Sequence, residues 1–507
     1  MLKFRKVLVA NRGEIAVRVM RTLREMGIAS VAICSEPDRT ALHVRTADEV
    51  RCLGGAEPAS SYLDIDGIVA ACKETGAEAV HPGYGFLAEN PDLPRALERA
   101  GIVFIGPPAD VLARVGNKTT ARRLMREAGV PVIPGMDAPS DDIDELARCA
   151  GEIGYPVLIK AAAGGGGKGM RVVREPADLA SATHEARSEA SASFGDGSIY
   201  LERYLDRPRH IEVQVLADGH GHVVHLFERE CSLQRRHQKI IEESPSPAVD
   251  GALRERMTQT AVTAARAAGY VNAGTVELLL DRERAGEFYF LEVNARLQVE
   301  HPVTEMVTGL DLVRLQVGIA AGEPLPFAQG QVTRHGHAIE CRIYAEDPSV
   351  GFAPSPGTVL LLRPPSGPGL RHDEGVVSGS EVPVYYDPIL AKLIAWAPDR
   401  DAAVARMIRA LGDYVILGVR TPVELLIHLV SSEEFRAGRL HTGLVQELVQ
   451  GWSPAPETDD LAVAAVLARE LHGRREVTAG TSGPSRIAGW PTPWQRLGAW
   501  DLRGGGR

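Results

Sequence analysis

The 507-residue sequence lacks long apolar runs, is poor in aromatic residues and has no paired cysteines. No apolar stretch reaches the roughly 20 residues of a membrane-spanning helix, and the apolar start at 7–10 is too short for a signal peptide. We therefore expect a cytoplasmic protein with no membrane partner. The absence of C-x-x-C spacing predicts reduced thiols and no structural zinc site. The six cysteines are Cys34, Cys52, Cys72, Cys149, Cys231 and Cys341.

Positive charge is not in excess either. The 56 Lys and Arg residues against 66 Asp and Glu residues give a net charge of −10, so the chain as a whole repels phosphate backbones. We expect no nucleic-acid partner. With 44% hydrophobic and 24% charged residues, the composition excludes disorder and fibres. At about 150 residues per domain, the length predicts about three domains and excludes a single small binding module.

Residues 7–106 alternate short apolar runs with amphipathic helical ones. This pattern is typical of βαβ units, so we predict a doubly wound α/β domain with a parallel sheet at 1–117. Residues 7–10 are the first predicted strand, and 15–26 form a helix that ends at Gly27. The further predicted strands are 30–33, 77–80 and 102–105.

After Gly116 the pattern changes to a basic helix at 118–127 and then to strands separated by glycine loops. We predict a second domain at 118–330, with a lid subdomain at about 133–205, and a mixed α+β third domain at 331–450. In the third domain we expect strands at 338–343 and 358–362 and helices at 402–411 and 423–429. The Pro- and Gly-rich tail at 451–507, with one helix at 461–471, is interpreted as a linker and docking segment.

Two turns of the first domain are candidate ligand sites. The turn at 10–14 can hold an anion at a helix N-terminus, but it lacks the G-x-G-x-x-G pattern, which favours a structural bend at Gly13. The turn at 81–86 follows a strand end, where open α/β sheets place ligands. A structural and a binding role are both open for this second turn.

The segment 157–173 carries four consecutive glycines between two apolar, β-like runs. It contains G-x-G-x-x-G at 164–169, yet no helix follows, and Gly169 stands where a P-loop needs Ser or Thr. A β-hairpin lid remains, in which bare amides approach phosphates while Lys160 and Lys168 supply positive charge. The alternative is a mobile surface hairpin.

A second hairpin, 274–280 followed by 288–300, is rich in acids. Along its second run apolar and polar residues alternate, which puts the polar ones on one face if the strand persists that far. Glu277, Glu292 and Asn294 then offer oxygen ligands for a Mg²⁺ ion that bridges nucleotide phosphates. The alternative is a plain solvated face. The polar residues of the second run are Glu292, Asn294, Arg296, Gln298 and Glu300.

Two further features place positive charge in unusual surroundings. The segment 230–239 is basic, as a nucleic-acid-binding patch is, but it lacks the interleaved aromatic residues of such a patch. An anion site is therefore favoured. Arg342 stands alone in the apolar strand 339–343, where its guanidinium needs either a structural ion-pair partner or an anion.

Together and in this order, these segments resemble the biotin carboxylases of the ATP-grasp superfamily. The resemblance runs from about Lys6 to about Glu447 and implies an α/β and α+β multidomain fold with an ATP-grasp domain. The segments that carry it are 10–16, 81–87, the glycine lid, 235–239, 292–306 and 340–342.

The resemblance implies a role for each matching residue. ATP would be bound by Lys118, Lys160, Gly166, Gly167, Lys168, Glu202, Leu205, His210, Gln234, His237, Glu277, Leu279 and Glu292, and two Mg²⁺ or Mn²⁺ ions by Glu277, Glu292 and Asn294. Bicarbonate would be bound by Lys239, Arg296, Gln298, the Val299 amide and Glu300, and biotin by Tyr84 and Arg342. The catalytic residues would be Glu300 as base, Arg342 as the donor to the biotin enolate oxygen, and Arg296 and Lys239.

The implied reaction is ATP-dependent carboxylation of biotin by bicarbonate through carboxyphosphate, the first half-reaction of an acyl-CoA carboxylase. No Met directly precedes a Lys, so the Ala-Met-Lys-Met attachment motif is absent and biotin is expected on a separate carrier protein. The resemblance also implies a homodimer that works with biotin carboxyl carrier and carboxyltransferase subunits. The alternative is another ATP-grasp carboxylate–amine ligase, which does not need Arg296, Glu300 and Arg342 together.

Overall fold

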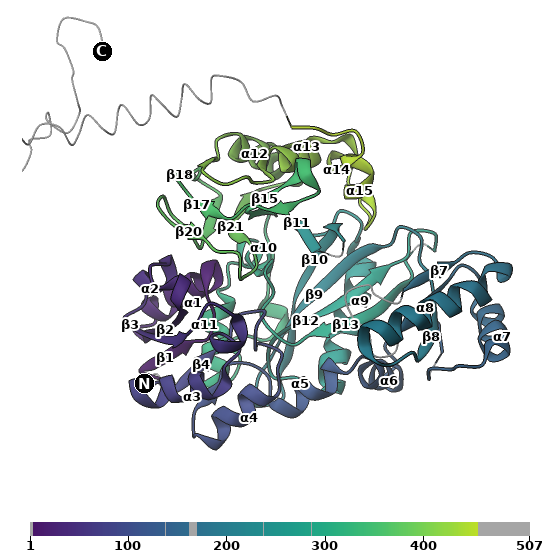
Figure 1. Cartoon of the computed structure of the whole chain (residues 1–507), viewed down its shortest axis with the longest axis horizontal. Coiled ribbons are helices and arrows are strands. Elements are labelled where there is room, and N and C mark those ends of the chain that lie inside the picture. The colour runs from purple at the N-terminus through teal and green to yellow at the C-terminus, as the bar shows by residue number, and fades with distance from the viewer. Residues whose placement is uncertain (1–3, 137, 162–169, 237, 285, 455–507) are drawn as a thin grey trace, which may run out of the picture. The chain divides into compact units, whose positions relative to one another are not determined.

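The computed structural model describes residues 4–454 except 137, 162–169, 237 and 285 (Figure 1). Its first part is a five-stranded sheet in the order β3-β2-β1-β4-β5, in which every strand pair is parallel. The predicted doubly wound arrangement is confirmed. The strands are β1 (Lys6–Val9), β2 (Ala29–Ser35), β3 (Glu49–Gly54), β4 (Ala79–His81) and β5 (Val103–Phe104). The helices up to residue 127 are α1 (Gly13–Glu25), α2 (Leu42–Thr46), α3 (Ile65–Thr75), α4 (Asp92–Arg99), α5 (Ala109–Gly116) and α6 (Lys118–Glu127).

Helix α1 forms where the sequence predicts it. Ile15, Val19 and Leu23 recur at helical spacing and are buried, so one face of the helix enters the core. The helix ends before Gly27, whose φ of +70° suits a residue without a side chain.

Asn11 joins the two turns at the carboxyl end of this sheet. Its side-chain amide donates to the carbonyls of Pro82 and Tyr84, each at 2.7 Å, and its oxygen accepts from the Arg12 N–H. These contacts account for the turn at 10–14 as a structural bend, the interpretation that the sequence favours.

A separate three-stranded sheet, in the order β7-β6-β8, carries the predicted glycine hairpin. Strand β6 pairs antiparallel with β7, and Leu158 faces Val172 across the pair. The hairpin is confirmed, while the glycine segment 162–169 itself lies outside the described residues. Figure 1 shows α7 and α8 beside this sheet. Its elements are β6 (Val157–Ala161), β7 (Arg171–Val173), β8 (Ile199–Arg203), α7 (Ile143–Ile153) and α8 (Leu179–Phe194).

The largest sheet has eight strands, paired antiparallel in the order β13-β12-β9-β10-β11-β14-β21-β19. Strand β11 pairs with β14, so the sheet continues across the predicted domain border at 330. The strands are β9 (Arg209–Ala217), β10 (Val223–Arg235), β11 (Gln238–Ser244), β12 (Asn272–Leu280), β13 (Phe288–Asn294), β14 (His337–Tyr344), β19 (Leu370–Glu374) and β21 (Ile389–Ala397).

Along strand β9, one face of the sheet packs in a hydrophobic core and the other face carries polar and charged side chains. Ile211, Val213 and Val215 pack with residues of α9 (Gly251–Ala267) in one hydrophobic core. His210 and Glu212 alternate with them and so face the other side of the sheet. One face is therefore a core and the other carries charge.

Helices also cover the C-terminal end of the large sheet. Helices α12 (Arg400–Gly412) and α13 (Val423–Ser431) share a core with β14 and β21, and they contain the predicted helices at 402–411 and 423–429 (Figure 1). The remaining helices are α10 (His301–Thr308), α11 (Leu312–Ala320), α14 (Glu433–Arg436) and α15 (Leu444–Val449).

The strand predicted at 358–362 is wrong as a single element. Strand β17 (Gly357–Thr358) pairs with β20 (Glu381–Val382), and β18 (Leu361–Arg363) pairs with β22 (Val415–Leu417). The chain changes partner between them, because the Val359 N–H bonds to Ser380 and the Leu360 N–H to Leu417. A third short pair joins β15 (Glu346–Asp347) and β16 (Ala353–Pro354).

None of the helices in the described part of the chain is both long and apolar enough to cross a membrane. The predicted helix at 461–471 and the rest of the tail from residue 455 lie outside the described residues.

Candidate active site

Three acids form a row across the charged face of the large sheet. Glu277 of β12 lies directly opposite Glu292 of β13 on one side and Glu212 of β9 on the other. Directly paired residues share a face, so the three carboxyl groups point the same way. Asn294 follows two positions after Glu292, opposite Thr275, and therefore belongs to this face as well. The hairpin brings together the predicted set Glu277, Glu292 and Asn294.

Lys239 occupies the centre of the acidic face. Its ammonium contacts Glu212 at 2.5 Å, Glu277 at 2.8 Å and Glu300 at 2.7 Å. Burial acts to lower the pKa of Lys239, but these three carboxylates hold that pKa well above its usual value. The lysine is therefore a permanent cation at a point where carboxylates converge from two strands and a loop.

Glu277 contacts a histidine as well as Lys239. His210 Nε2 lies 3.0 Å from its second oxygen. Burial acts to raise the pKa of Glu277, but Lys239 and His210 hold that pKa well below its usual range. In contrast, burial and the charge of Glu277 raise the pKa of Glu292, which Lys118 only partly opposes.

This asymmetry tests the predicted metal site. Burial and the charge of Glu277 both raise the pKa of Glu292, and a divalent cation relieves this effect; Mg²⁺ prefers the hard oxygens of Glu277, Glu292 and Asn294. The carboxylates of Glu212 and Glu277 also lie close enough to His210 for a metal, but the Lys239 ammonium already holds both of them. The donor set therefore fits Mg²⁺ or Mn²⁺ on the Glu292 side.

The expected strand does not continue to Glu300. Strand β13 ends at Asn294, and residues 295–300 form an irregular segment that leads into α10. Glu89 accepts hydrogen bonds from the Ala295 N–H at 3.0 Å and from Arg296 Nε at 2.9 Å, which draws the chain out of the sheet. The predicted single-face alternation is therefore wrong beyond Asn294.

The irregular segment nevertheless keeps its polar groups near one another. Arg296 donates to Gln298 Oε1 at 3.1 Å and to Asn294 Oδ1 at 3.2 Å. Among the described residues, the Gln298 side-chain nitrogen is buried and has no hydrogen-bond partner. A buried donor left without a partner is costly, so this amide is a natural contact for a small anion.

Glu300 connects this segment to the third part of the chain. It is fully buried and accepts from Arg342 at 3.0 Å as well as from Lys239. Burial acts to raise the pKa of Glu300, but Lys239 and Arg342 hold that pKa well below its usual range. The group is a carboxylate at neutral pH. It can accept a proton once substrate draws its cationic partners away.

Arg342 has a second partner in Glu242 of β11, at 2.6 Å from Nε. Burial raises the pKa of Glu242 to about 7, although Arg342 opposes this effect. The sequence left two partners open for Arg342, a structural acid or an anion. The structure shows the ion pair with Glu242, and anion binding stays a prediction for a residue that lies in the charged cluster with Glu300.

The described residues that are predicted to bind the nucleotide make contacts with one another or with neighbouring side chains. Leu205 packs with Ile133 and Tyr289 in a small apolar cluster to which Leu279 adds. Glu202 is held by ion pairs with Lys160 and Arg122. The Gln234 side chain contacts His210 Nδ1 at 3.4 Å. Gly166, Gly167, Lys168 and His237 lie outside the described residues.

Within the basic segment 230–239, one cation has a structural role and another belongs to the candidate site. Arg235 pairs with Glu346 at 3.0 Å and stacks on Phe352, so it is engaged in the fold. Lys239, at the start of β11, is the described member that reaches the acids. Tyr84 lies in the turn after β4, and its ring centroid is 5.8 Å from the ammonium of Lys392.

Sequence reasoning missed four charged groups that complete the cluster: Glu89, Glu212, Arg229 and Glu242. Arg229 is fully buried and bonds to Glu212, to Gln214 at 2.8 Å and to Thr304 at 2.8 Å. For Glu212 a signal was present, because polar and apolar residues alternate along β9.

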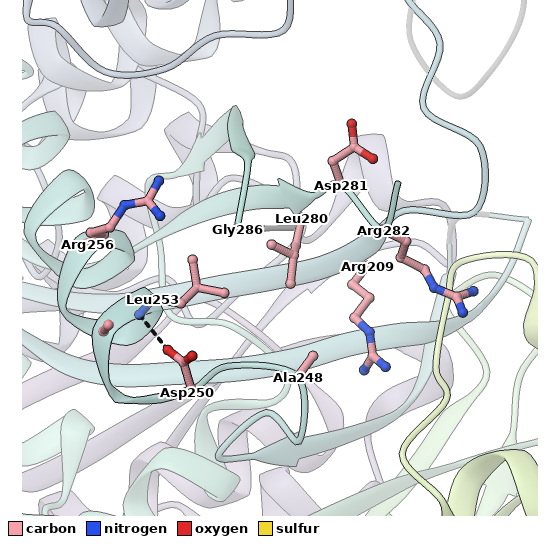
Figure 2. A pocket seen from close by; sticks show the side chains of 10 residues that line it. Arg209, Ala248, Asp250, Leu253, Arg256, Leu280, Asp281, Arg282 and Gly286 are labelled. Atoms are coloured by element: carbon pink, nitrogen blue, oxygen red, sulfur yellow. Dashed lines mark hydrogen bonds between the residues drawn. The ribbon is translucent and has the colours of Figure 1, made fainter. Parts of the chain in front are cut away.

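A cavity of about 500 Å³ lies apart from this cluster, at the N-terminus of α9 (Figure 2). Arg209, Leu280 and Asp281 line it, and Asp250 caps the helix there by accepting from the Leu253 N–H at 2.8 Å. None of the predicted site residues lines this cavity, so it is not the candidate site.

The arrangement defines a class of protein. The hairpin strands on either side of the glycine segment, paired acids whose oxygens suit a divalent cation, and a buried amide that suits a small anion are together typical of a nucleotide-dependent ligase. Three family models match in order: "Biotin carboxylase, N-terminal domain" at 3–112, "Carbamoyl-phosphate synthase L chain, ATP binding domain" at 117–328 and "Biotin carboxylase C-terminal domain" at 340–447.

Individual relatives agree with the family models. The biotin carboxylase of Nostoc sp. is 50% identical over 447 residues, which cover 88% of this chain and 100% of that protein. The biotin carboxylase of Halalkalibacterium halodurans is 52% identical over 442 residues, which cover 87% of this chain and 97% of that protein. The chain belongs to the biotin carboxylase family.

Solved structures show the same fold. The biotin carboxylase domain of 2-oxoglutarate carboxylase from Hydrogenobacter thermophilus, a dimer in complex with MgADP, ADP and bicarbonate, superposes with a TM-score of 0.83. It is 48% identical, and the match covers 89% of this chain and 99% of that one. A Campylobacter jejuni biotin carboxylase, solved as a beta-gamma-ATP complex, gives a TM-score of 0.83 at 45% identity, over 87% of this chain and 98% of that one.

Proposed function

We propose that this chain carboxylates biotin, consuming ATP and bicarbonate and releasing ADP and phosphate. The observation that carries the proposal is the continuous charged cluster from Glu292 through Glu277, Lys239 and Glu300 to Arg342. It places candidate metal ligands, a fixed ammonium, a buried carboxylate and a guanidinium in one contact network. Each of these groups has a task in this reaction.

Bicarbonate is bound by the cations and donors around the irregular segment. Lys239, Arg296, the Gln298 amide and the Val299 N–H hold its negative oxygens, and these contacts orient the hydroxyl toward Glu300. Glu300 removes the proton as a bicarbonate oxygen attacks the γ-phosphorus of ATP, which forms carboxyphosphate and releases ADP. Lys239 then remains as the cation that balances the new charge.

The ATP end of the site supports this attack. Lys160 and Lys118 supply positive charge for the phosphates, together with Lys168 and the lid amides of Gly166 and Gly167. Glu277, Glu292 and Asn294 would hold the divalent ions, which would supply positive charge to the phosphate oxygens.

The base and ribose side is built from neighbouring side chains. Leu205 and Leu279 present apolar surface to adenine, beside Glu202, and His210, Gln234 and His237 supply polar contacts to the nucleotide. Leu205 and Leu279 already lie in one cluster, and His210 already contacts Gln234, which supports this assignment.

Arg342 acts on the second substrate. Carboxyphosphate yields CO₂ and phosphate, the departing phosphate takes the proton of the ureido nitrogen, and that nitrogen bonds to the carbon of CO₂. Arg342 donates to the enolate oxygen that develops on biotin, and Tyr84 lies beside the ring. Donors aimed at developing charge are the largest single contribution to many enzymatic rates.

Biotin is expected on a separate biotin carboxyl carrier protein, and a separate carboxyltransferase is expected to consume the carboxybiotin. We also infer a homodimer. The family membership supports the separate carrier, and the dimeric structure of the Hydrogenobacter domain supports the homodimer. The acyl or keto substrate that finally receives the carboxyl group is chosen by the carboxyltransferase.

One experiment tests the function directly. The purified chain is given Mg-ATP, bicarbonate and free biotin, and ADP release is followed with each component omitted in turn. We expect ADP release to require bicarbonate and to rise with biotin. ADP release that ignored biotin and rose with an amino acid would instead identify a carboxylate–amine ligase.

A further inference from the structure

Lys392 is a buried lysine in the middle of an apolar strand, outside the set of residues assigned above. It lies in β21, whose other residues are Ile, Leu, Ala and Trp, and its side chain has no solvent exposure. An ammonium group taken out of water is costly unless carboxylates and hydrogen-bond acceptors compensate it. The contacts of this one group therefore show what holds it there.

Its ammonium contacts two different parts of the chain. It donates to the Val299 carbonyl oxygen at 3.0 Å and lies 3.0 Å from a Glu14 oxygen. Asp373 lies further away, at 4.0 Å, and is itself bonded to Arg371. The short contacts therefore join β21 to the irregular segment and to the first turn of α1.

The sheet register places Lys392 beside Arg342. Lys392 of β21 lies directly opposite Arg342 of β14 and directly opposite Asp373 of β19. These three residues form one row on the face that carries the site, because directly paired residues share a face. Lys392 thus contacts the segment 295–300 at the Val299 carbonyl, whereas Lys239 contacts it at the Glu300 carboxylate.

The accepting carbonyl belongs to the peptide that links Val299 to Glu300. This segment has left the β-sheet, so strand pairing does not fix its position. We propose that Lys392 is a positioning residue for the bicarbonate step: by holding the Val299 carbonyl, it fixes the Val299 N–H and the Glu300 carboxylate where bicarbonate binds. The proposal rests on the proposed function.

Glu14 anchors the lysine from the N-terminal sheet. Glu14 is buried, and the backbone of the large-sheet region approaches it closely, since a Cβ on Gly375 would lie 2.5 Å from the Glu14 nitrogen. Glu340 is buried nearby without a hydrogen-bond partner among the described residues, and burial raises its pKa well above the usual value. Glu14 is the carboxylate closest to the ammonium, at 3.0 Å against 4.0 Å for Asp373.

The experiment compares two variants with a matched control. Lys392→Met keeps the length of the side chain and removes the bond to Val299. The pair Glu14→Gln with Lys392→Met removes both charges, so no uncompensated buried carboxylate remains to unfold the protein. Lys6→Met is the control, because Lys6 also bonds a glutamate, at 2.5 Å from Glu49, and a carbonyl, at 2.7 Å from Thr75, but lies in the parallel sheet.

Steady-state ADP release is measured against bicarbonate and against ATP, with thermal unfolding of each variant. In both Lys392 variants we expect the KM for bicarbonate to rise about tenfold or more while the KM for ATP stays within about twofold. The Lys6→Met control keeps both constants. A lysine that only stabilised the fold would lower the melting temperature without separating the two constants.

The result that overturns the proposal is a bicarbonate KM within about twofold of the unmodified chain in either folded variant, or an equal rise of both constants. Failure of the proposed function is distinguishable, because it shows in the unmodified chain as ADP release that does not depend on bicarbonate.

Discussion

The two large sheets use charge in opposite ways. The parallel sheet is apolar on both faces of its central strand β1, with Leu8 in one core and Val7 and Val9 in another, and the charged Lys6 lies at the end of that strand. The antiparallel sheet is apolar on one face only, and along β9 and β12 its other face carries charge in the middle of strands. A strand end allows a charge to sit beside solvent, whereas a mid-strand charge depends on other side chains.

This difference shows why the cluster of the antiparallel sheet is interdependent. Lys239 compensates three carboxylates, and Arg342 compensates two. Removing one of these cations leaves two or three buried acids with one cationic partner fewer. In the parallel sheet, by contrast, Lys6 pairs with a half-exposed Glu49, so its loss removes one ion pair, whose acid water can solvate.

The largest effect should follow from Lys239→Met. Three buried carboxylates lose their common cation, so we expect bicarbonate-dependent ADP release to fall by about a thousandfold. The free energy of unfolding should fall by about 3–5 kcal/mol, which denaturant titration measures. The matched change in the parallel sheet, Lys6→Met, should cost at most about 1 kcal/mol. Equal losses at Lys239 and Lys6 would break the contrast between the two sheets.

Arg342→Ala should have a smaller and more selective effect. The loss of one donor to the developing enolate costs about 3 kcal/mol of barrier, so biotin carboxylation should fall on the order of a hundredfold. Nucleotide binding, followed by equilibrium titration with ATP, should stay within about twofold. Equal losses of carboxylation and nucleotide binding would contradict the assigned role.

An arginine of the parallel sheet provides the control for this prediction. Arg12 makes two bonds to the buried Asp38, at 2.6 and 2.8 Å, at the end of β1. Arg12→Ala should lower the free energy of unfolding by about 3 kcal/mol, and the ratio of biotin-dependent to biotin-independent ADP release should be retained.

The smallest expected effect is a pH dependence at Glu14. Burial raises its pKa from 4.5 to about 6, although Lys392 opposes the shift. A carboxyl group with a raised pKa in the folded state contributes most below pH 4.5, and its contribution is lost as the pH rises through about 6. Relative to Glu14→Gln, the unmodified chain should lose roughly 2 kcal/mol between these pH values. The free energies of unfolding of the two proteins are compared between pH 4.5 and pH 6, and a difference that stays constant over this range would refute the raised pKa of Glu14.

Local patterns predicted much of this molecule. The basic helix 118–127 is α6 with the same bounds, and the acid hairpin pairs Glu277 with Glu292 as the alternation requires. Both depend on residues close in sequence, where periodicity alone decides which side chains meet. The same alternation marks Glu212 in β9, which sequence reasoning passed over.

The predictions that were wrong or missing depend on residues far apart in the sequence. The alternation continues to Glu300, yet β13 ends at Asn294 because Glu89, from the other end of the fold, bonds to Ala295 and Arg296. Lys392 is as conspicuous in its apolar strand as Arg342, but only the register of β14 and β21 reveals that they are neighbours. Such a register is set by the whole sheet rather than by either strand.

The shared ladder between β11 and β14 limits how this enzyme can be shortened. A fragment that ended near residue 330 would leave one edge of β11 with its backbone donors and acceptors unpaired. Edges of this kind recruit strands from other molecules, so the fragment should aggregate rather than persist as an isolated nucleotide-binding module. A minimal version of the protein must therefore retain β14, β21 and β19, even for work that concerns ATP alone.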